Sequence, residues 1–164
     1  MLERLKDKVA EIRAQAVTAL QRLQDPRDDQ CPIVRAFVFH LGYDPSAIVR
    51  RTIAKCICAN RLTLTHVVKR TLDVDEQVRR AAYKFIADKI HIKSMTIAQR
   101  EEIIRRGLTD RSDNVKSVVS KDLVPAWLRL CNESICEFLY ALDVGNSGDG
   151  KTAKEVLNVI FKAR

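Results

Sequence analysis

The fold is decided by the stretch Asp44-Pro-Ser-Ala-Ile-Val-Arg50, because its pattern of Asp, four residues, an aliphatic residue and a base occurs four times. The copies begin at Asp7, Asp44, Asp73 and Asp110. In each copy, apolar residues follow four and eight positions after the aliphatic residue, a spacing that places them on one stripe of an α-helix. The sequence therefore predicts four similar helices, each with one buried face.

The repeated Asp is expected to begin each helix. Its carboxylate can accept hydrogen bonds from the free N–H groups of the first turn, and Pro45 suits that turn. Helical spacing also occurs between the copies, in residues 31–41, 62–72 and 96–108. Short turns join these stretches to the motif helices, so each unit is an antiparallel helix pair. Helix pairs at this interval predict an all-α fold, a HEAT-like α-solenoid of stacked antiparallel helix pairs.

The array is expected to fill residues 1–142 with about four units. The first unit is incomplete, since residues 8–23 form a motif helix with no partner before it. We expect a piece of a longer array, whose cut end exposes an apolar face unless Met1–Asp7 extends the helix to cover it. Residues 125–142 are predicted to form one further helix. Residues 143–164 are predicted to form a glycine-rich loop and a final helix that continues the array.

Composition narrows the class of protein. The chain has 164 residues, a formal net charge of +8, five Gly and four Pro, which argues against disordered, collagen-like or turn-rich β proteins. It has no apolar stretch of membrane-spanning length and no signal peptide at its start, so secretion and membrane spanning are not expected. An odd number of cysteines, five, favours reduced thiols in the cytosol or nucleus over a disulfide framework.

The basic excess is local. Residues 50–121 carry 17 basic and 8 acidic side chains, whereas the flanking segments are close to neutral. A concentrated positive surface attracts polyanions through counterion release, so DNA or RNA is the first partner to consider, followed by acidic protein tails and anionic lipid. A solvated Lys/Arg-rich surface with no ligand would give the same count.

One nucleotide-binding motif is rejected. Gly145–Thr152 matches G-x4-G-K-T, whose backbone N–H groups wrap phosphates in nucleotide hydrolases. Such a loop leaves a buried parallel strand, but the preceding residues have helical spacing, and we expect a loop between helices instead. His40, His66 and His91 are far apart, and Cys56 and Cys58 lack a second ligand pair, so no metal site, no cofactor and no catalysis are predicted.

Several strings resemble a known family. They are Arg22-Leu-Gln-Asp-Pro26, Val49-Arg-Arg51, Val78-Arg-Arg-Ala-Ala-Tyr83 and Gly107-Leu-Thr-Asp-Arg-Ser-Asp113. With them the chain resembles, from about residue 4 to 142, part of the G-type HEAT-repeat subunits of condensin, the chromosome-associated protein G family. The resemblance implies a non-enzymatic scaffold that binds a kleisin segment and double-stranded DNA, without sequence specificity, in mitotic chromosome condensation. It also implies indirect association with SMC ATPases, and a location in the nucleus on chromosomes, with the cytoplasm as a further location outside mitosis.

The family resemblance assigns no individual DNA contact, so candidate residues come from the repeat itself. The base after each aliphatic residue is expected to pair with the Asp of an adjacent unit, as a structural ladder, or to make a secondary DNA contact: Arg13, Arg50, Arg79 and Lys116. The better DNA-binding candidates are the additional cations on these helices: Arg51, Lys55, Arg80, Lys84 and Lys121. Because Arg51/Lys55 and Arg80/Lys84 are each spaced i, i+4 at equivalent positions of successive units, stacked helices would align them in a stripe. Arg105 and Arg106 are expected on another surface.

A second function remains open at this point. A HEAT-type scaffold of another complex, binding an extended peptide or an acidic protein without nucleic acid, would show the same repeats and the same charge distribution. Binding of duplex DNA at several salt concentrations separates the two functions.

Overall fold

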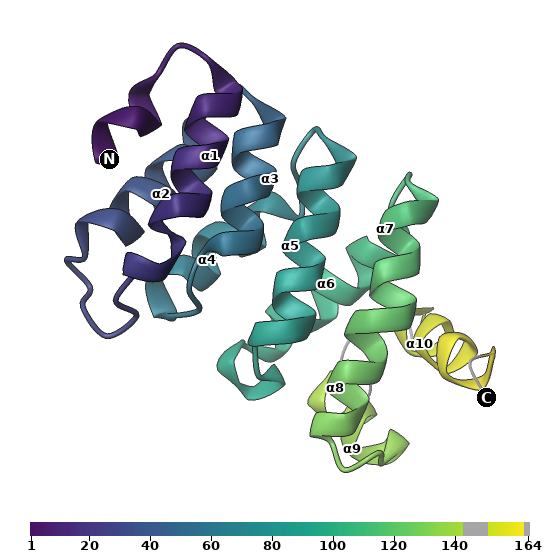
Figure 1. The fold of residues 1–164 in the computed structure, drawn as a ribbon. Helices are drawn as coiled ribbons and strands as arrows, with labels where there is room; N and C mark the ends of the chain where they lie inside the picture. Colours follow the sequence, from purple (N-terminus) through teal and green to yellow (C-terminus); the bar gives the residue numbers. More distant parts are fainter. Residues whose placement is uncertain (143–150, 163–164) are drawn as a thin grey trace. The chain divides into compact units, whose positions relative to one another are not determined.

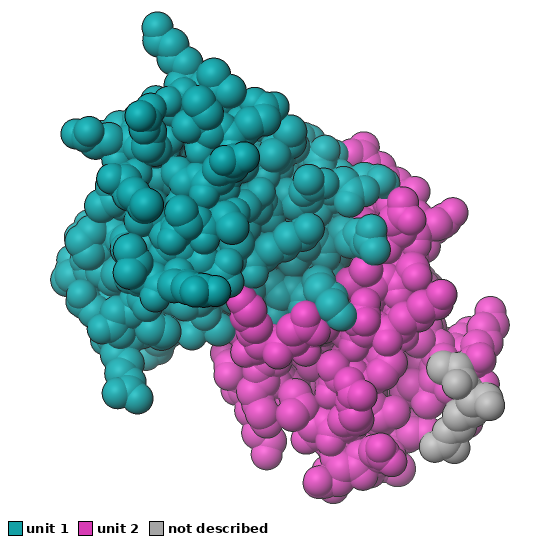
Figure 2. Space-filling view, viewed as in Figure 1, with its two compact units in different colours: residues 1–85 teal, residues 86–164 magenta. Residues whose placement is uncertain are grey.

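The computed structural model describes residues 1–142 and 151–162, and within these ranges it contains helices and turns but no β-strand. The chain divides into two compact units, residues 1–85 and 86–164, which Figure 2 colours separately. The all-α prediction is therefore confirmed. The expected distinction between residues 1–142 and 143–164 stays a prediction, because residues 143–150 lie outside the described part.

The first unit consists of two layers of helices (Figure 1). Its elements are η1 (Leu2–Lys6), α1 (Ala10–Leu20), η2 (Gln21–Leu23), α2 (Pro32–Tyr43), α3 (Ala47–Cys56), α4 (Arg61–Arg70) and residues 76–85 of α5 (Glu76–Lys89). Helix α1 packs against α3, and α2 packs against α3 and α4. The motif helices α1 and α3 thus share one layer, and the intervening helices α2 and α4 share the other, as expected for stacked helix pairs.

The repeated apolar positions form the core between the layers. Val49, Ile53 and Ile57 of the second copy are completely buried, and so are Val78, Ala82 and Ile86 of the third. Phe37 and Leu41 of α2 lie in the same core. Removing such aliphatic side chains from water contributes about 1.5–3 kcal/mol each, so the stripe that the sequence predicted supplies much of the folding free energy.

The first motif helix differs from the others in its burial. Ile12 is 39% exposed, whereas its counterparts Val49, Val78 and Val115 are fully buried. Met1–Asp7 does not extend α1; instead the short 3-10 turn η1 packs against α1, buries Leu5 and covers part of this face. It leaves Ile12 partly open because a single turn covers less of the stripe than a full helix does.

The role predicted for the repeated Asp is wrong in one respect. Each motif helix begins three residues after the Asp, at Ala10, Ala47, Glu76 and Asp113. The carboxylate accepts a hydrogen bond from the N–H two residues ahead, at Val9 (3.0 Å), Ser46 (2.9 Å), Asp75 (3.0 Å) and Ser112 (2.8 Å). The Asp therefore closes a turn before the helix, and Pro45 lies in this turn and not in the first helical turn.

The second unit continues the pattern of a paired helix followed by a motif helix. Its elements are η3 (Ile92–Ser94), α6 (Ile97–Leu108), α7 (Asp113–Val118), η4 (Val119–Leu123), α8 (Val124–Leu130), α9 (Ile135–Ala141) and α10 (Lys151–Lys162). Helices α7 and α8 are joined by η4, a π-helical turn, into one continuous helix (Figure 1). The π turn ends at Leu123, two residues before Pro125, which has no N–H to donate and so interrupts the regular α-helical hydrogen bonding.

The prediction of one helix over residues 125–142 is wrong. Helix α8 ends at Leu130, and Asn132 and Glu133 adopt left-handed backbone angles, with φ of 54° and 58°. Helix α9 then begins after Ser134, whose hydroxyl accepts a hydrogen bond from the N–H of Glu137. Helix α10 packs against α6 and α8 in the same unit.

Candidate nucleic-acid interface

The arginine that follows the buried aliphatic residue is held in place by its own turn. Arg13 Nη1 donates to the carbonyl oxygens of Asp7 (2.9 Å) and Lys8 (3.2 Å). Arg50 Nη1 contacts the corresponding oxygens of the next copy, Asp44 (2.7 Å) and Pro45 (3.1 Å). Arg79 Nη1 repeats the arrangement with Asp73 and Val74. The six-residue spacing between Asp and Arg therefore places each guanidinium over the turn that precedes its own helix.

The other edge of the guanidinium binds the Asp of the following unit. Arg13 donates from Nε to Asp44 Oδ2 (2.9 Å) and from Nη2 to Asp44 Oδ1 (2.8 Å). Arg50 makes the same two bonds with Asp73, at 2.9 and 2.8 Å. These are bidentate, charge-assisted hydrogen bonds, and both side chains of each pair are largely buried. We call these two pairs, Arg13–Asp44 and Arg50–Asp73, the arginine–aspartate ladder.

The ladder holds its carboxylates in the ionised form. Burial raises the pKa of Asp44, but hydrogen bonds from Arg13, Ser46 and His40 outweigh it, so the pKa lies below its usual value. For Asp73, burial is likewise outweighed by Arg50 and by the N–H of Asp75, and its pKa is also lowered. Since the N–H groups of Arg13 and Arg50 donate hydrogen bonds to carboxylates and carbonyl oxygens, these side chains are poorly placed to bind phosphate.

Lys116 occupies the ladder position in the fourth copy but behaves differently. Its Nζ lies 3.1 Å from Asp113 Oδ1, in an exposed pair within the same helix. A pair of this kind contributes little to stability, because solvent screens both charges. Lys116 is therefore more accessible to a ligand than Arg13 or Arg50.

The first four DNA-binding candidates lie on α3 and α5. Arg51 is half-buried, and Lys55, Arg80 and Lys84 are exposed. Arg51 and Arg80 form no side-chain hydrogen bond or ion pair with any described residue, whereas Lys55 and Lys84 each have an interaction partner within the chain. We call these four residues the basic stripe. Arg51 and Arg80 are its most available cations.

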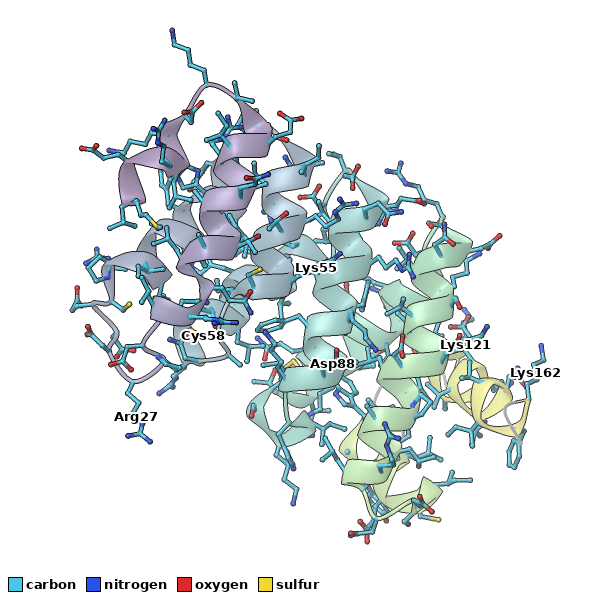
Figure 3. The ribbon with its side chains drawn as sticks, in the orientation of Figure 1. Arg27, Lys55, Cys58, Asp88, Lys121 and Lys162 are labelled. Atoms are coloured by element: carbon cyan, nitrogen blue, oxygen red, sulfur yellow. The ribbon has the colours of Figure 1, made fainter. Side chains whose placement is uncertain are left out.

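Lys121, in the second unit, occupies the same repeat position as two members of the basic stripe. Lys55, Lys84 and Lys121 each follow the buried Val of their copy by six residues. Lys121 is exposed in the π turn η4, and Figure 3 shows it there together with Lys55 on α3. In the first copy the equivalent position holds Thr18. The sequence places Lys55 and Lys84 at equivalent positions of successive units, and aligning the helices on the buried Val adds Lys121 to the same register.

Two further basic residues are engaged elsewhere. Arg105 and Arg106 of α6 both form ion pairs with Glu102, one turn earlier on the same helix. The hydrogen bond from Arg105, together with the nearby Arg106, holds the pKa of Glu102 below its usual value. This cluster neutralises part of its own charge and competes poorly for phosphate.

The rejected nucleotide motif lies mostly outside the described residues, since only Lys151 and Thr152 are described. Both begin α10, and the buried Thr152 hydroxyl lies 3.3 Å from Glu101 Oε1. Across residues 1–142 and 151–162, no group of three His, Cys, Asp or Glu side chains is arranged to hold a metal ion. Within the same ranges, no helix is long and apolar enough to cross a membrane.

Sequence reasoning missed a surface on the opposite layer. Phe39 and Tyr43 of α2 are 59% and 78% exposed, although Phe37 and Leu41 of the same helix are buried as predicted. Residues 32–43 and 61–70 contain no Asp or Glu, a signal that was available in the sequence.

Comparison with known proteins identifies relatives along almost the whole chain. No family model matches. The chain is 47% identical to human condensin complex subunit 3 and 44% identical to that of Xenopus laevis, in each case over 98% of the chain. Identity to the Schizosaccharomyces pombe condensin complex subunit 3 is 32% over 91% of the chain. The chain spans 15–17% of the length of these relatives.

A solved structure supports the same relationship. The crystal structure of the S. pombe condensin Cnd3–Cnd2 subcomplex contains a chain that matches with a TM-score of 0.88 and 30% identity, covering 99% of this chain and 21% of that one. The stacked helix pairs described above are thus those of a HEAT-type α-solenoid. The resemblance that the sequence motifs indicated is confirmed.

Proposed function

We propose that the chain is part of a non-enzymatic condensin scaffold, because almost the whole chain matches one segment of its relative, condensin complex subunit 3. This scaffold binds double-stranded DNA without sequence preference and a segment of the kleisin subunit. Through the complex it connects the SMC ATPases to mitotic chromosomes in the nucleus.

The observation that carries the DNA-binding proposal is the availability of Arg51 and Arg80. They lie at equivalent positions of successive motif helices, α3 and α5, and have no partner among the described residues. The neighbouring ladder arginines are fixed by carboxylates and stabilise the fold. Arg51 and Arg80 are not fixed in this way and can therefore bind a ligand. Contacts of this kind reach phosphate oxygens and do not read base edges, which accounts for binding without sequence preference.

Charge reversal tests the DNA-binding proposal. We expect the Arg51→Glu/Arg80→Glu variant to bind a 30-base-pair duplex at least about tenfold more weakly, with a shallower dependence of affinity on salt, because each lost phosphate contact removes about 0.9 from the slope. The matched control is Arg22→Glu/Arg27→Glu, which reverses two exposed cations outside the stripe in the same unit. Equal duplex affinity for the two variants, with helicity retained, would show that the stripe does not bind DNA.

Partner binding is supported by the Cnd3–Cnd2 subcomplex, in which the similar chain is bound to a second subunit. The resemblance implies that the corresponding partner is the kleisin. Calorimetric titration of the chain with successive kleisin peptides, with and without duplex DNA, tests this part separately. Absence of binding by every kleisin segment would remove the kleisin from the proposed function and leave the DNA result unaffected.

A further inference from the structure

The layer formed by α2 and α4 carries a surface that the basic stripe does not use. We call it the α2–α4 face, and its members are Arg35, Phe39 and Tyr43 of α2, Arg61, Thr65, Lys69 and Arg70 of α4, and Leu72 and Val74 in the turn that follows. The two helices pack side by side, so these side chains form one continuous surface of the first unit. The basic stripe lies on the motif helices α3 and α5.

Large apolar side chains are concentrated at one end of this face. The rings of Phe39 and Tyr43 are one helical turn apart, with centroids 5.4 Å from each other. Leu72 is 61% exposed and Val74 is 80% exposed. Exposed apolar side chains that occur singly need no explanation, but a cluster rimmed by polar groups is typical of a protein-binding site. Aromatic residues in particular supply much of the binding energy at such sites.

The charged side chains that α2 and α4 themselves contribute to the face all have the same sign. Neither α2 nor α4 contains an acidic residue, and together they present Arg35, Arg61, Lys69 and Arg70. The side chains of Arg61 and Lys69 form no hydrogen bond or ion pair with any described residue. Arg70 is paired with Asp73 at 3.3 Å, and Arg35 contacts Gln30. The surface is thus complementary to a ligand that carries carboxylates.

Two hollows lie along the line between the helices. The first, with a volume of about 560 Å³, is lined by Arg35 and the preceding Asp29 and Gln30 on one side, and by Arg61, Leu62 and His66 on the other. The second, of about 300 Å³, is lined by Tyr43, Arg70, Leu72 and Val74 and, on its inner side, by the ladder residues Asp44, Arg50 and Asp73. Residues 35 and 43 are separated by about 12 Å along α2, a distance that about four residues of an extended peptide cover.

We propose that the α2–α4 face binds an acidic peptide segment of a partner protein. An aromatic or aliphatic side chain of this segment occupies the 300 Å³ hollow against Tyr43 and Leu72, and its carboxylates bind Arg61 and Lys69. A peptide supplies both kinds of group, whereas the backbone of duplex DNA supplies charge but nothing apolar to cover the exposed rings. This site goes beyond the proposed function, which assigns DNA to the basic stripe and gives the kleisin segment no position on the α2–α4 face.

Selection from a random peptide library tests the proposal, because the face itself then chooses its ligand. A display library of 12-residue peptides is selected on the 164-residue chain and counter-selected on the Leu72→Ser/Lys69→Glu variant. We expect enrichment of peptides that combine Asp or Glu with an aromatic or aliphatic residue. Synthetic versions should bind the variant at least about tenfold more weakly, the loss expected when one apolar anchor and one ion pair are removed.

The matched control is Leu23→Ser/Arg27→Glu. Leu23 and Leu72 are equally exposed, at 61%, and Arg27 is an exposed cation of the same unit outside the face. This variant should keep the peptide affinity of the unaltered chain, and both double variants should keep their affinity for duplex DNA. Tyr43→Ser provides a second test of the apolar hollow if the first variant loses helicity.

Three outcomes would overturn the proposal. The first is a library that yields no acidic consensus, or no binder at all. The second is equal binding of the selected peptides to the unaltered chain and to both α2–α4 variants. The third is displacement of these peptides by a single-stranded oligonucleotide that binds the face more tightly, since stacking of bases on Phe39 and Tyr43 would then be the better explanation.

Discussion

Arg13 and Asp44 are 31 positions apart in the chain, yet Arg13 Nε and Nη2 donate to the two carboxylate oxygens of Asp44 at 2.9 and 2.8 Å. The same guanidinium donates to the carbonyl oxygen of Asp7 at the start of its own unit. One side chain therefore fixes two successive turns at once. Arg50 repeats this arrangement with Asp44 behind it and Asp73 ahead.

This geometry explains why the Asp and the Arg recur together. The Asp side chain closes its own turn and receives the guanidinium of the preceding unit, while its carbonyl oxygen receives the Arg of its own unit. Substituting either residue leaves buried donors or acceptors without partners at two places. Removing one partner of such a buried pair strongly destabilises the fold, because the other charge is left buried and unpaired. The intact pairs fix the register of neighbouring helix pairs.

Asp73→Ala is predicted to destabilise the chain by about 3–5 kcal/mol, because it leaves the buried Arg50 guanidinium without its counter-charge. Urea unfolding followed by circular dichroism measures the loss. Asp113→Ala is the control, since the Asp113–Lys116 pair is exposed and should contribute very little. Similar midpoints for the two variants would mean that the ladder does not stabilise the fold.

Stability is predicted to decrease on the acid side. Because the pKa values of Asp44 and Asp73 are lower in the folded chain than in the unfolded chain, the unfolded state binds more protons as the pH falls toward their usual values. Their contribution is complete above about pH 5 and is lost progressively below it. Urea midpoints measured from pH 7 to pH 3 should fall less steeply for Asp73→Asn than for the unaltered chain.

The ladder shows how far the sequence alone could lead. The apolar spacing predicted the helix pairs, and the recurrence of the Asp and the Arg at equivalent positions of successive units predicted their pairing. The spacing could not show that the Asp precedes its helix by three residues, since an Asx turn and a helix cap use the same residue types. The end of α8 could not be predicted from the sequence either, because Asn132 and Glu133 adopt left-handed backbone angles and no glycine marks the end of the helix.

The candidate binding surfaces were predictable to different degrees. Equivalent positions in two helices identified Arg51 and Arg80, but their lack of partners among the described residues needed coordinates. The helical spacing correctly predicted that Phe37 is buried, but it made no prediction for Phe39, which lies two residues later on the opposite side of α2. Exposure of an aromatic ring depends on which neighbours cover it, and this information is spread over α2, α4 and their turns.

His66 provides a local probe of charge on the α2–α4 face. Burial, followed by the positive charges of Lys69 and Arg70, holds the pKa of His66 below its usual value. Lys69→Gln is therefore expected to raise this pKa, as observed by the NMR titration of the imidazole protons. Arg22→Gln, on a different element, should leave the titration of His66 unchanged, and a shift of equal size in both variants would contradict the assignment.

The shared position of Lys55, Lys84 and Lys121 leads to a gain-of-function prediction. Thr18 occupies the same position in the first copy, is exposed, and lies on α1 beside α3. Thr18→Lys should extend the basic stripe by one cation, strengthening duplex binding and steepening its salt dependence by about 0.9. The control is Ala19→Lys, which adds the same charge at an exposed position about 100° further round the helix. If only the added charge mattered, and not its position in the repeat, both variants would bind duplex DNA equally more tightly. A selective gain for Thr18→Lys, measured by fluorescence anisotropy at several salt concentrations, would identify this repeat position as the one that faces DNA.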